Sequence, residues 1–231
     1  MLLSQLILVA PLRALDRGPG ILCVDDFEDD AAGHLPRGWE THSDDGAAAP
    51  YTVEADGSGK FLAARDRGQS VILARRFRVD LDRYPYLTFR WRVHEIPRDA
   101  DERTGRKGDS AASVYITYRT VLGFIPVAVK YVWSSTLPVG TALRRKGTGR
   151  PWIVVAGSGH HGIGEWQTLV FDVRAAYRET FGGEPPRQAV GVGLLSDANA
   201  TGSTASADYD DVCFLSKADA GSGIQHIVEA D

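Results

Sequence analysis

The chain has 231 residues, a formal net charge of −4 and a hydrophobic fraction of 43%, values typical of a globular protein rather than a disordered one. Its 26 basic and 30 acidic residues are interspersed, which gives no reason to expect a nucleic-acid partner. The 25 glycines and 11 prolines separate many short apolar runs, and this pattern favours strands and turns over helices.

The N-terminal stretch MLLSQLILVAPLRAL is apolar for about ten positions, fewer than the roughly 20 that cross a bilayer. The sequence therefore predicts no transmembrane segment. Residues 1–20 are interpreted either as a signal-like segment or as an unstructured N-terminus. Residues 21–217 are predicted to form a single domain, and residues 218–231 a loose tail.

Short apolar or alternating runs predict about ten strands. The clearest is LTFRWRV (87–93), in which every second residue is apolar and the other face carries Arg90 and Arg92. The other predicted strands are Ile21–Glu28, Tyr51–Val53, Lys60–Ala64, Ser70–Phe77, Ser113–Tyr118, Val127–Trp133, Trp152–Ala156, Trp166–Val173, Ala189–Leu195 and Ala207–Phe214.

One helix is predicted after Asp172, which is a suitable N-cap, and it should end at Gly182–Gly183. Ile96–Asp109 and Leu137–Arg150 are predicted to be loops, and both are rich in charged residues. Many strands without β-α alternation indicate an all-β fold, an antiparallel β-sandwich or jelly roll of the galactose-binding-like kind, with one short helix.

The first and last strands, ILCVDDFE and ADYDDVCF, are both acidic and are expected to pair antiparallel where the sandwich closes. One register places three pairs opposite each other: Cys23 with Cys213, Asp25 with Asp211, and Phe27 with Tyr209. Facing cysteines are able to form a disulfide in an oxidising compartment. Facing carboxylates repel each other, so a cation or an arginine is expected between them.

The segment before the last strand has the spacing of a calcium loop. Asp197, Asn199 and Thr201 recur at alternate positions, Gly202 follows for the turn, and Asp208 occupies the twelfth position. The alternative is a hairpin loop rich in Asp and Asn with solvated acids. The hypothesis is a structural Ca²⁺ ion, with candidate ligands Asp25, Glu28, Asp197, Asn199, Asp208 and Asp211.

Several motifs resemble those of a bacterial family known as domain of unknown function 3047. They extend over about Val24–Phe214 and are VDDFED, GHLPRGW, YPYLTFRWRV, GDSAASVYITY, YVWSS, AYRETFGGEPP, SDANATG and ADYDDVCF. The resemblance implies a single exported or periplasmic β-sandwich and brings no established activity. More loosely, the FE…W opening and the YDDV ending are similar to carbohydrate-binding jelly rolls, which often hold a structural calcium between their terminal strands.

For catalysis, the candidates are His160 and His161, in a glycine-rich loop, together with Glu165. A surface turn is the alternative interpretation of this loop. Paired carboxylates for glycoside hydrolysis would have to come from one charged loop, for which a solvated loop is the alternative. The acidic residues of that loop are Glu95, Asp99, Asp101, Glu102 and Asp109.

For binding, the exposed side of the strands is better supplied, because aromatic rings stack on sugars while charged groups bind hydroxyls and carboxylates. In the alternative interpretation, the aromatic residues are core and the arginines pair with nearby acids. The candidate ligand-binding residues are Arg90, Arg92, Asp109, Tyr115, Lys130 and Trp133.

These observations predict a periplasmic or secreted protein that binds a carbohydrate or another small envelope ligand without catalysis. A polysaccharide-acting hydrolase or lyase is the alternative function, and a purely structural envelope protein is a third. The sequence leaves the oligomeric state open.

Overall fold

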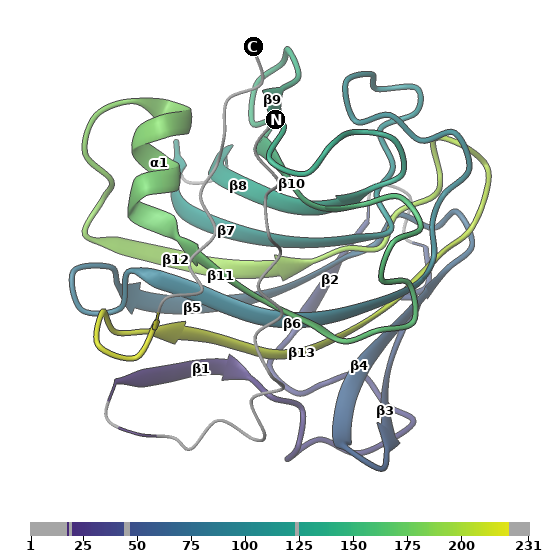
Figure 1. The fold of residues 1–231 in the computed structure, drawn as a ribbon, viewed down its shortest axis with the longest axis horizontal. Coiled ribbons are helices and arrows are strands. Elements are labelled where there is room, and N and C mark those ends of the chain that lie inside the picture. The colour runs from purple at the N-terminus through teal and green to yellow at the C-terminus, as the bar shows by residue number, and fades with distance from the viewer. Residues whose placement is uncertain (1–17, 19, 44–46, 123–124, 222–231) are drawn as a thin grey trace.

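A computed structural model describes residues 18, 20–43, 47–122 and 125–221. Two β-sheets face each other as a sandwich, and a single helix lies beside one end of the strands (Figure 1). The predicted all-β sandwich is therefore confirmed. The proposed signal-like segment and most of the predicted tail lie outside the described residues. Within them, no helix is long and apolar enough to cross a membrane.

Sheet A contains both terminal strands of the described chain. Its strands lie side by side in the order β11, β6, β13, β4 and β3, and β1 pairs with β13 on the same side as β4. Their bounds are β1 (Ile21–Asp25), β3 (Tyr51–Asp56), β4 (Gly59–Asp66), β6 (Tyr86–Glu95), β11 (Gln167–Asp172) and β13 (Ala205–Leu215).

Sheet B has the spatial order β2, β5, β12, β7, β8, β10 and β9. Its bounds are β2 (Glu40–His42), β5 (Ile72–Asp80), β7 (Ala112–Val121), β8 (Ile125–Ser134), β9 (Ala142–Arg144), β10 (Trp152–Ser158) and β12 (Gln188–Leu194). The sequence did not predict β2 or β9, because three residues are too few to show an alternating pattern.

One strand pair departs from the predicted antiparallel arrangement. β10 runs parallel to β8 and antiparallel to β9. The chain leaves β8, turns back as the edge strand β9, and turns again to return as β10 between them. Two reversals give β10 the direction of β8, and this detour falls within the segment that was predicted to be a loop.

The core lies between the sheets and is filled by the apolar side of each strand. All four alternating apolar residues of β6 are fully buried, as predicted. Phe89 packs edge-to-face on Trp91, and the Tyr131 ring stacks on Phe171 with 4.0 Å between ring centres. Each buried side chain of this size contributes about 1.5–3 kcal/mol to folding.

Helix α1 (Val173–Phe181) begins and ends where the sequence predicts. The Asp172 carboxylate accepts hydrogen bonds from the backbone N–H groups of Arg174 and Ala175, both at 2.9 Å. These bonds satisfy two amides that have no partner within the helix. Gly182 follows with φ of 72°, a backbone conformation that glycine adopts without strain.

The terminal strands pair as predicted at the cysteines only. Cys23 lies opposite Cys213 and is joined to it by a disulfide. Asp25 lies opposite Val212 instead of Asp211, because the register shifts between Cys23 and Asp25. Asp211 itself has a φ of 48°, at an irregularity where β13 pairs with β6. The prediction of the next two pairs is therefore wrong, and a β-bulge is the reason.

Past the bulge, Phe27 lies beyond the end of β1 and does not pair with Tyr209. The Asp25 carboxylate has two partners: Arg75 contacts it at 2.5 Å and the indole N–H of Trp39 donates to it at 2.7 Å. A cation or an arginine was expected beside the acids of the terminal strands. At Asp25, the structure has the arginine, Arg75.

Candidate functional site

The residues predicted for ligand binding are divided between the two sheets. Arg90 and Arg92 lie on the outer side of sheet A, whereas Tyr115 and Lys130 lie on the outer side of sheet B. Trp133 is core: its side chain is 1% exposed, and its indole N–H donates to the Gly159 carbonyl at 3.0 Å. These candidate residues therefore do not share one face of the sandwich.

The outer side of sheet A is occupied by ion pairs. Arg90 contacts both Asp210 and Asp211 at 3.2 Å. The guanidinium groups of Arg90 and Arg92 also lie over the Trp166 ring, at 4.7 and 4.6 Å from its centre. Burial, followed by the charge of Asp211, raises the pKa of Asp210 to about 8. One guanidinium shared by two carboxylates does not fully offset the effect of burial, so ionisation of Asp210 is disfavoured.

Asp208 belongs to the same set of ion pairs on sheet A. Its buried carboxylate accepts hydrogen bonds from Arg65 at 2.7 Å and Arg92 at 2.9 Å, and lies 2.6 Å from the His94 ring. In the calcium-loop hypothesis, Asp208 closes the loop. The structure instead gives that carboxylate three cationic or polar partners from β4 and β6.

The other proposed calcium ligands are also separated. The Thr201 hydroxyl donates to Asp109 at 2.7 Å. Exposed Glu28 accepts the backbone N–H of Lys60, so its carboxylate belongs to the turn that joins β3 and β4. Within the described ranges, no three His, Cys, Asp or Glu side chains are grouped to hold a metal ion. Bound calcium stays a prediction; Asp197 and Asn199 line one of the hollows described below, and Asp25 lines a smaller hollow of about 480 Å³.

The catalytic candidates lie at the surface. His160, His161 and Glu165 are exposed on the loop between β10 and β11, and they line neither of the hollows described below. In the charged loop, Asp101 is paired with Arg103 at 2.7 Å. Glu102 is fully buried and accepts hydrogen bonds from two serine hydroxyls. The remaining acids of that loop, Glu95 and Asp99, are exposed, and Asp109 is buried.

The outer side of sheet B contains a groove of about 850 Å³, here called the face groove. The strand register places Ala74, Gly193, Tyr115 and Lys130 side by side across four neighbouring strands. Except for Arg75, their neighbours along each strand belong to the core, so this row faces outward. A Cβ atom on Gly193 would lie 3.5 Å from Tyr115 and Ile72, so any side chain longer than alanine would occupy the groove.

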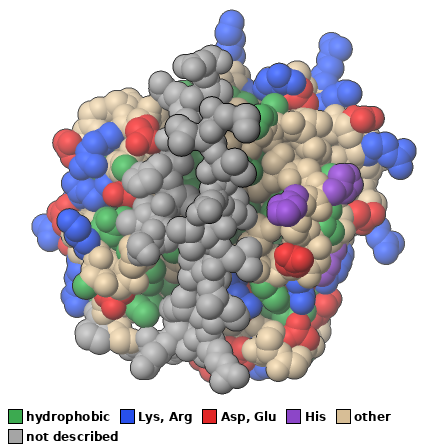
Figure 2. Space-filling view, in the orientation of Figure 1, with side chains coloured by type: hydrophobic (Ala, Val, Ile, Leu, Met, Phe, Trp, Pro, Cys, Tyr) green, Lys and Arg blue, Asp and Glu red, His purple; other side chains and the backbone are tan. Residues whose placement is uncertain are grey.

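A second hollow of about 1040 Å³, here called the basic hollow, lies beside the face groove. Arg145 and Arg150 line both, so the two hollows are adjacent. Figure 2 shows Lys and Arg side chains projecting at the top and upper right, around the position of β9 in Figure 1. The basic hollow is lined by Ser70, Arg103, Gly105, Arg106, Gly108, Asp109, Arg144, Arg145, Lys146, Arg150, Asp197, Asn199 and Ala200.

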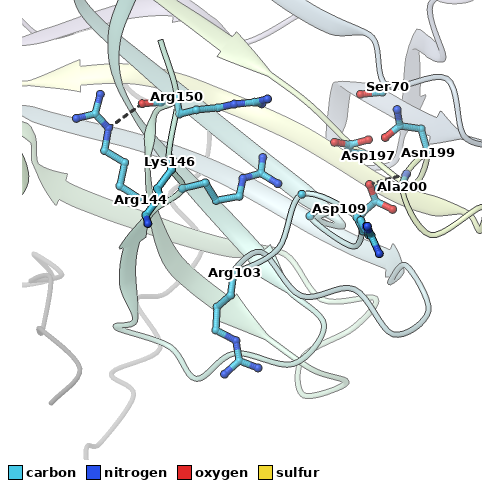
Figure 3. Close-up of a pocket in the computed structure, with 13 residues that line it drawn as sticks. Ser70, Arg103, Asp109, Arg144, Lys146, Arg150, Asp197, Asn199 and Ala200 are labelled. Carbon is cyan, nitrogen blue, oxygen red and sulfur yellow. Dashed lines mark hydrogen bonds between the residues drawn. The ribbon is translucent and has the colours of Figure 1, made fainter. Parts of the chain in front are cut away.

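Figure 3 shows the two walls of the basic hollow. Arg144, Lys146 and Arg150 extend from one side, and Asp197 and Asn199 lie on the other. The basic side chains, here called the basic wall, come from the loop between β6 and β7 and from the chain between β8 and β10. Asp197 and Asn199, here called the acidic wall, come from the loop between β12 and β13. The hollow is thus assembled from loops that are distant in the sequence.

Asp197 is held at the acidic wall by its backbone. It forms a β-bridge with Ser110, and the neighbouring Asp109 carboxylate accepts the backbone N–H groups of Ala200 at 3.1 Å and Thr201 at 2.7 Å. The side chain of Asp197 is 8% exposed, and its Oδ1 atom has no hydrogen-bond partner among the described residues. Burial raises the pKa of Asp197, opposed by the charge of Lys130. A buried acceptor without a partner favours a ligand that donates.

Lys130 lines the face groove. It is 4% exposed, and its ammonium group is 5.4 Å from the centre of the Tyr115 ring. Glu102, also near it, accepts hydrogen bonds from the hydroxyls of Ser110 at 3.0 Å and Ser134 at 2.6 Å. Burial raises the pKa of Glu102, and the charge of Lys130 partly opposes this rise. Lys130 thus places a positive charge under the groove without an ion pair to any described residue.

The sequence indicated part of this site. Tyr115, Lys130, Asp109, Asp197 and Asn199 were each selected, although for two different hypotheses. The basic wall was missed. Its signal was the density of Arg and Lys in two predicted loops, but a loop sequence does not show that the two loops meet.

Comparisons with known proteins agree with the motif resemblance. The chain is similar to a family 11 carbohydrate-binding module of a Clostridium thermocellum cellulase, at 11% identity and a TM-score of 0.44, over 90% of this chain and 97% of the module. It is also similar to the K1 cleaved adhesin domain of Lys-gingipain from Porphyromonas gingivalis, at 14% identity and a TM-score of 0.42, over 85% of this chain and 98% of that domain. No curated protein matches. Residues 37–213 match the model of the family described as "Protein of unknown function (DUF3047)", and the chain belongs to that family.

Proposed function

We propose that this protein binds a saccharide, or an envelope ligand of similar chemistry, in the face groove, without catalysis. The observation that carries the proposal is the face groove itself, a hollow of about 850 Å³ across the outer side of regular strands. Its size is that of small-molecule and oligosaccharide sites, about 300–1,000 Å³.

The lining of the groove suits a sugar ring, which has apolar faces and a rim of hydroxyl groups. The Tyr115 ring, Ala74 and Ile153 supply apolar surface. Thr117 and Lys130 supply polar groups beside it. Because the floor is a hydrogen-bonded sheet, these side chains are positioned before the ligand arrives, which lowers the entropic cost of binding.

The disulfide between Cys23 and Cys213 supports export of the protein. Disulfides persist in the periplasm and outside the cell but are rare in the reducing cytosol. We therefore place the binding function in the periplasm or outside the cell.

The hydrolase or lyase alternative has less support. His160, His161 and Glu165 lie at the surface, outside both hollows. In the charged loop, Asp101 is in a salt bridge and Glu102 is buried among serine hydroxyls. Neither arrangement provides a cleft with an acid and a base on opposite sides of a bond.

The test is a glycan array followed by calorimetry with the best ligand. Tyr115→Ala removes the stacking ring from the face groove, and we expect it to weaken binding at least about tenfold. Trp166→Ala is the matched control, because it removes an aromatic ring that packs on the outer side of the opposite sheet, and we expect unchanged affinity. Thermal melting should confirm that both variants are folded. The proposal fails if no glycan binds, or if Trp166→Ala weakens binding while Tyr115→Ala does not.

A further inference from the structure

The charge of the basic hollow differs from that of the whole chain. The chain has a net charge of −4, yet the residues that line this hollow include six basic and only two acidic side chains. A concentration of positive charge in a concave site attracts and binds anions. The six basic residues are Arg103, Arg106, Arg144, Arg145, Lys146 and Arg150.

Two of these arginines are placed to contact a ligand that extends from the face groove. Arg145 and Arg150 line both hollows. Arg145 is fixed by a hydrogen bond from its guanidinium to the Thr104 carbonyl at 3.2 Å, which leaves its other N–H groups available. A guanidinium group binds a carboxylate, sulfate or phosphate through two parallel hydrogen bonds.

The opposite wall requires a different group on the same ligand. Asp197 presents an acceptor oxygen without a partner among the described residues, and burial makes that state costly. Asn199 beside it offers both a donor and an acceptor. A ligand that fits both walls carries an acid group on one side and hydroxyl donors on the other.

We infer that the ligand of the face groove is an acidic saccharide, whose acid group is bound by Arg145 and Arg150 while a sugar hydroxyl donates to Asp197. This inference rests on the proposed function and names its substrate class. The acid group is a carboxylate, as in a polyuronate, or a sulfate or phosphate ester. A nucleic acid fits less well, because Asp109 and Asp197 would face its dense phosphate charge across the hollow.

The experiment compares five probes by calorimetry at low salt. They are polygalacturonate for carboxylate, dextran sulfate for sulfate, phosphomannan for phosphate, a neutral mixed-linkage β-glucan, and single-stranded DNA. The test variant is Arg145→Gln/Arg150→Gln. The control variant, Arg178→Gln/Arg187→Gln, removes the same charge from exposed arginines that pair with Glu184 and Asp80 outside both hollows.

We expect one of the acidic saccharides to bind more tightly than the β-glucan. The test variant should lose at least about tenfold in affinity for it, and the control variant should lose little. Wild-type affinity for the same probe should also fall as salt is raised from 20 to 200 mM, a readout that needs no variant.

The inference is overturned if the β-glucan binds as tightly as the acidic probes, or if binding persists unchanged in the test variant and in high salt. In that case the face groove still binds saccharides and the proposed function stands. Preference for DNA would replace the saccharide with another polyanion and overturn both. Failure of every probe would contradict the proposed function itself.

Discussion

Both outer surfaces of the sandwich carry basic and aromatic side chains. On sheet A the two arginines of β6 are in ion pairs, whereas on sheet B Lys130 has none with a described residue. On sheet A, Arg90 and Arg92 contact acids of β13 and lie over Trp166. On sheet B, Lys130 lies under a groove beside Tyr115 and has no ion pair to a described residue. Arginine and aromatic residues on a strand therefore identify a binding face only when the neighbouring strand does not already supply their partners.

This difference also separates stability from binding. Ion pairs on sheet A hold the last strand against its neighbours, so changes there should alter stability and leave the ligand affinity of sheet B unchanged. Changes in the face groove should have the opposite effect. The predictions below test this separation.

The largest effect is expected at Asp208. Its carboxylate is fully buried beneath Arg65, Arg92 and His94, so Asp208→Asn leaves these groups without their anion. We expect a loss of about 3 kcal/mol in the free energy of unfolding, measured by urea denaturation. Asp82→Asn, which breaks an exposed pair with Arg174, should cost less than about 1 kcal/mol.

Asp208→Asn should not change glycan affinity in the protein that remains folded. A loss as small as that of Asp82→Asn would show that the sheet A ion pairs are not a unit. A loss of affinity at unchanged stability would place the binding face on sheet A.

A smaller effect is expected from pH. The pKa of Asp210 is raised from 3.8 to about 8, so the folded protein holds a proton that the unfolded chain releases at lower pH. The stability from this group is greatest below about pH 4 and declines as the pH rises towards 8. One unit of pKa difference corresponds to about 1.4 kcal/mol, and we expect a decline of more than about 1 kcal/mol between pH 5 and 8.

The control for this prediction is Asp210→Asn, which keeps the shape of the side chain and cannot ionise. Its urea midpoint should fall less than that of the wild type over the same pH range. If both proteins show the same decline, then the proton is not held at Asp210. Neither this pH change nor Asp210→Asn should alter the affinity of the face groove for its ligand.

Much of the fold followed from local patterns in the sequence. The alternation in β6, the N-cap at Asp172 and the pairing of Cys23 with Cys213 were all predicted, because each depends on neighbouring residues or on a single pair. The register beyond Cys23 could not be predicted, since one bulge moves Asp25 from Asp211 to Val212. The parallel direction of β10 could not be predicted either, because it depends on the edge strand β9, which is too short to show a pattern.

The site was predictable in its parts but not as an assembly. The sequence identified Tyr115 and Lys130 by strand alternation, and Asp197 by the spacing of oxygen-bearing side chains. It could not show that Asp197 lines the same hollow as Arg145 and Arg150, because that arrangement depends on how two loops fold beside sheet B. For the same reason, the sequence included Arg90 and Arg92 among the ligand-binding candidates. It does not show that they form ion pairs with the acids of β13.

The central claim is that ligand binds on sheet B and not on sheet A. The most direct measurement is amide hydrogen exchange of the wild-type protein with and without a saturating saccharide. We expect slower exchange in the loop that carries Asp197 and in the chain from β9 to β10, which line the hollows, and unchanged exchange in β6 and β13. Protection confined to β6, β13 and the loop that carries Trp166 would contradict the account.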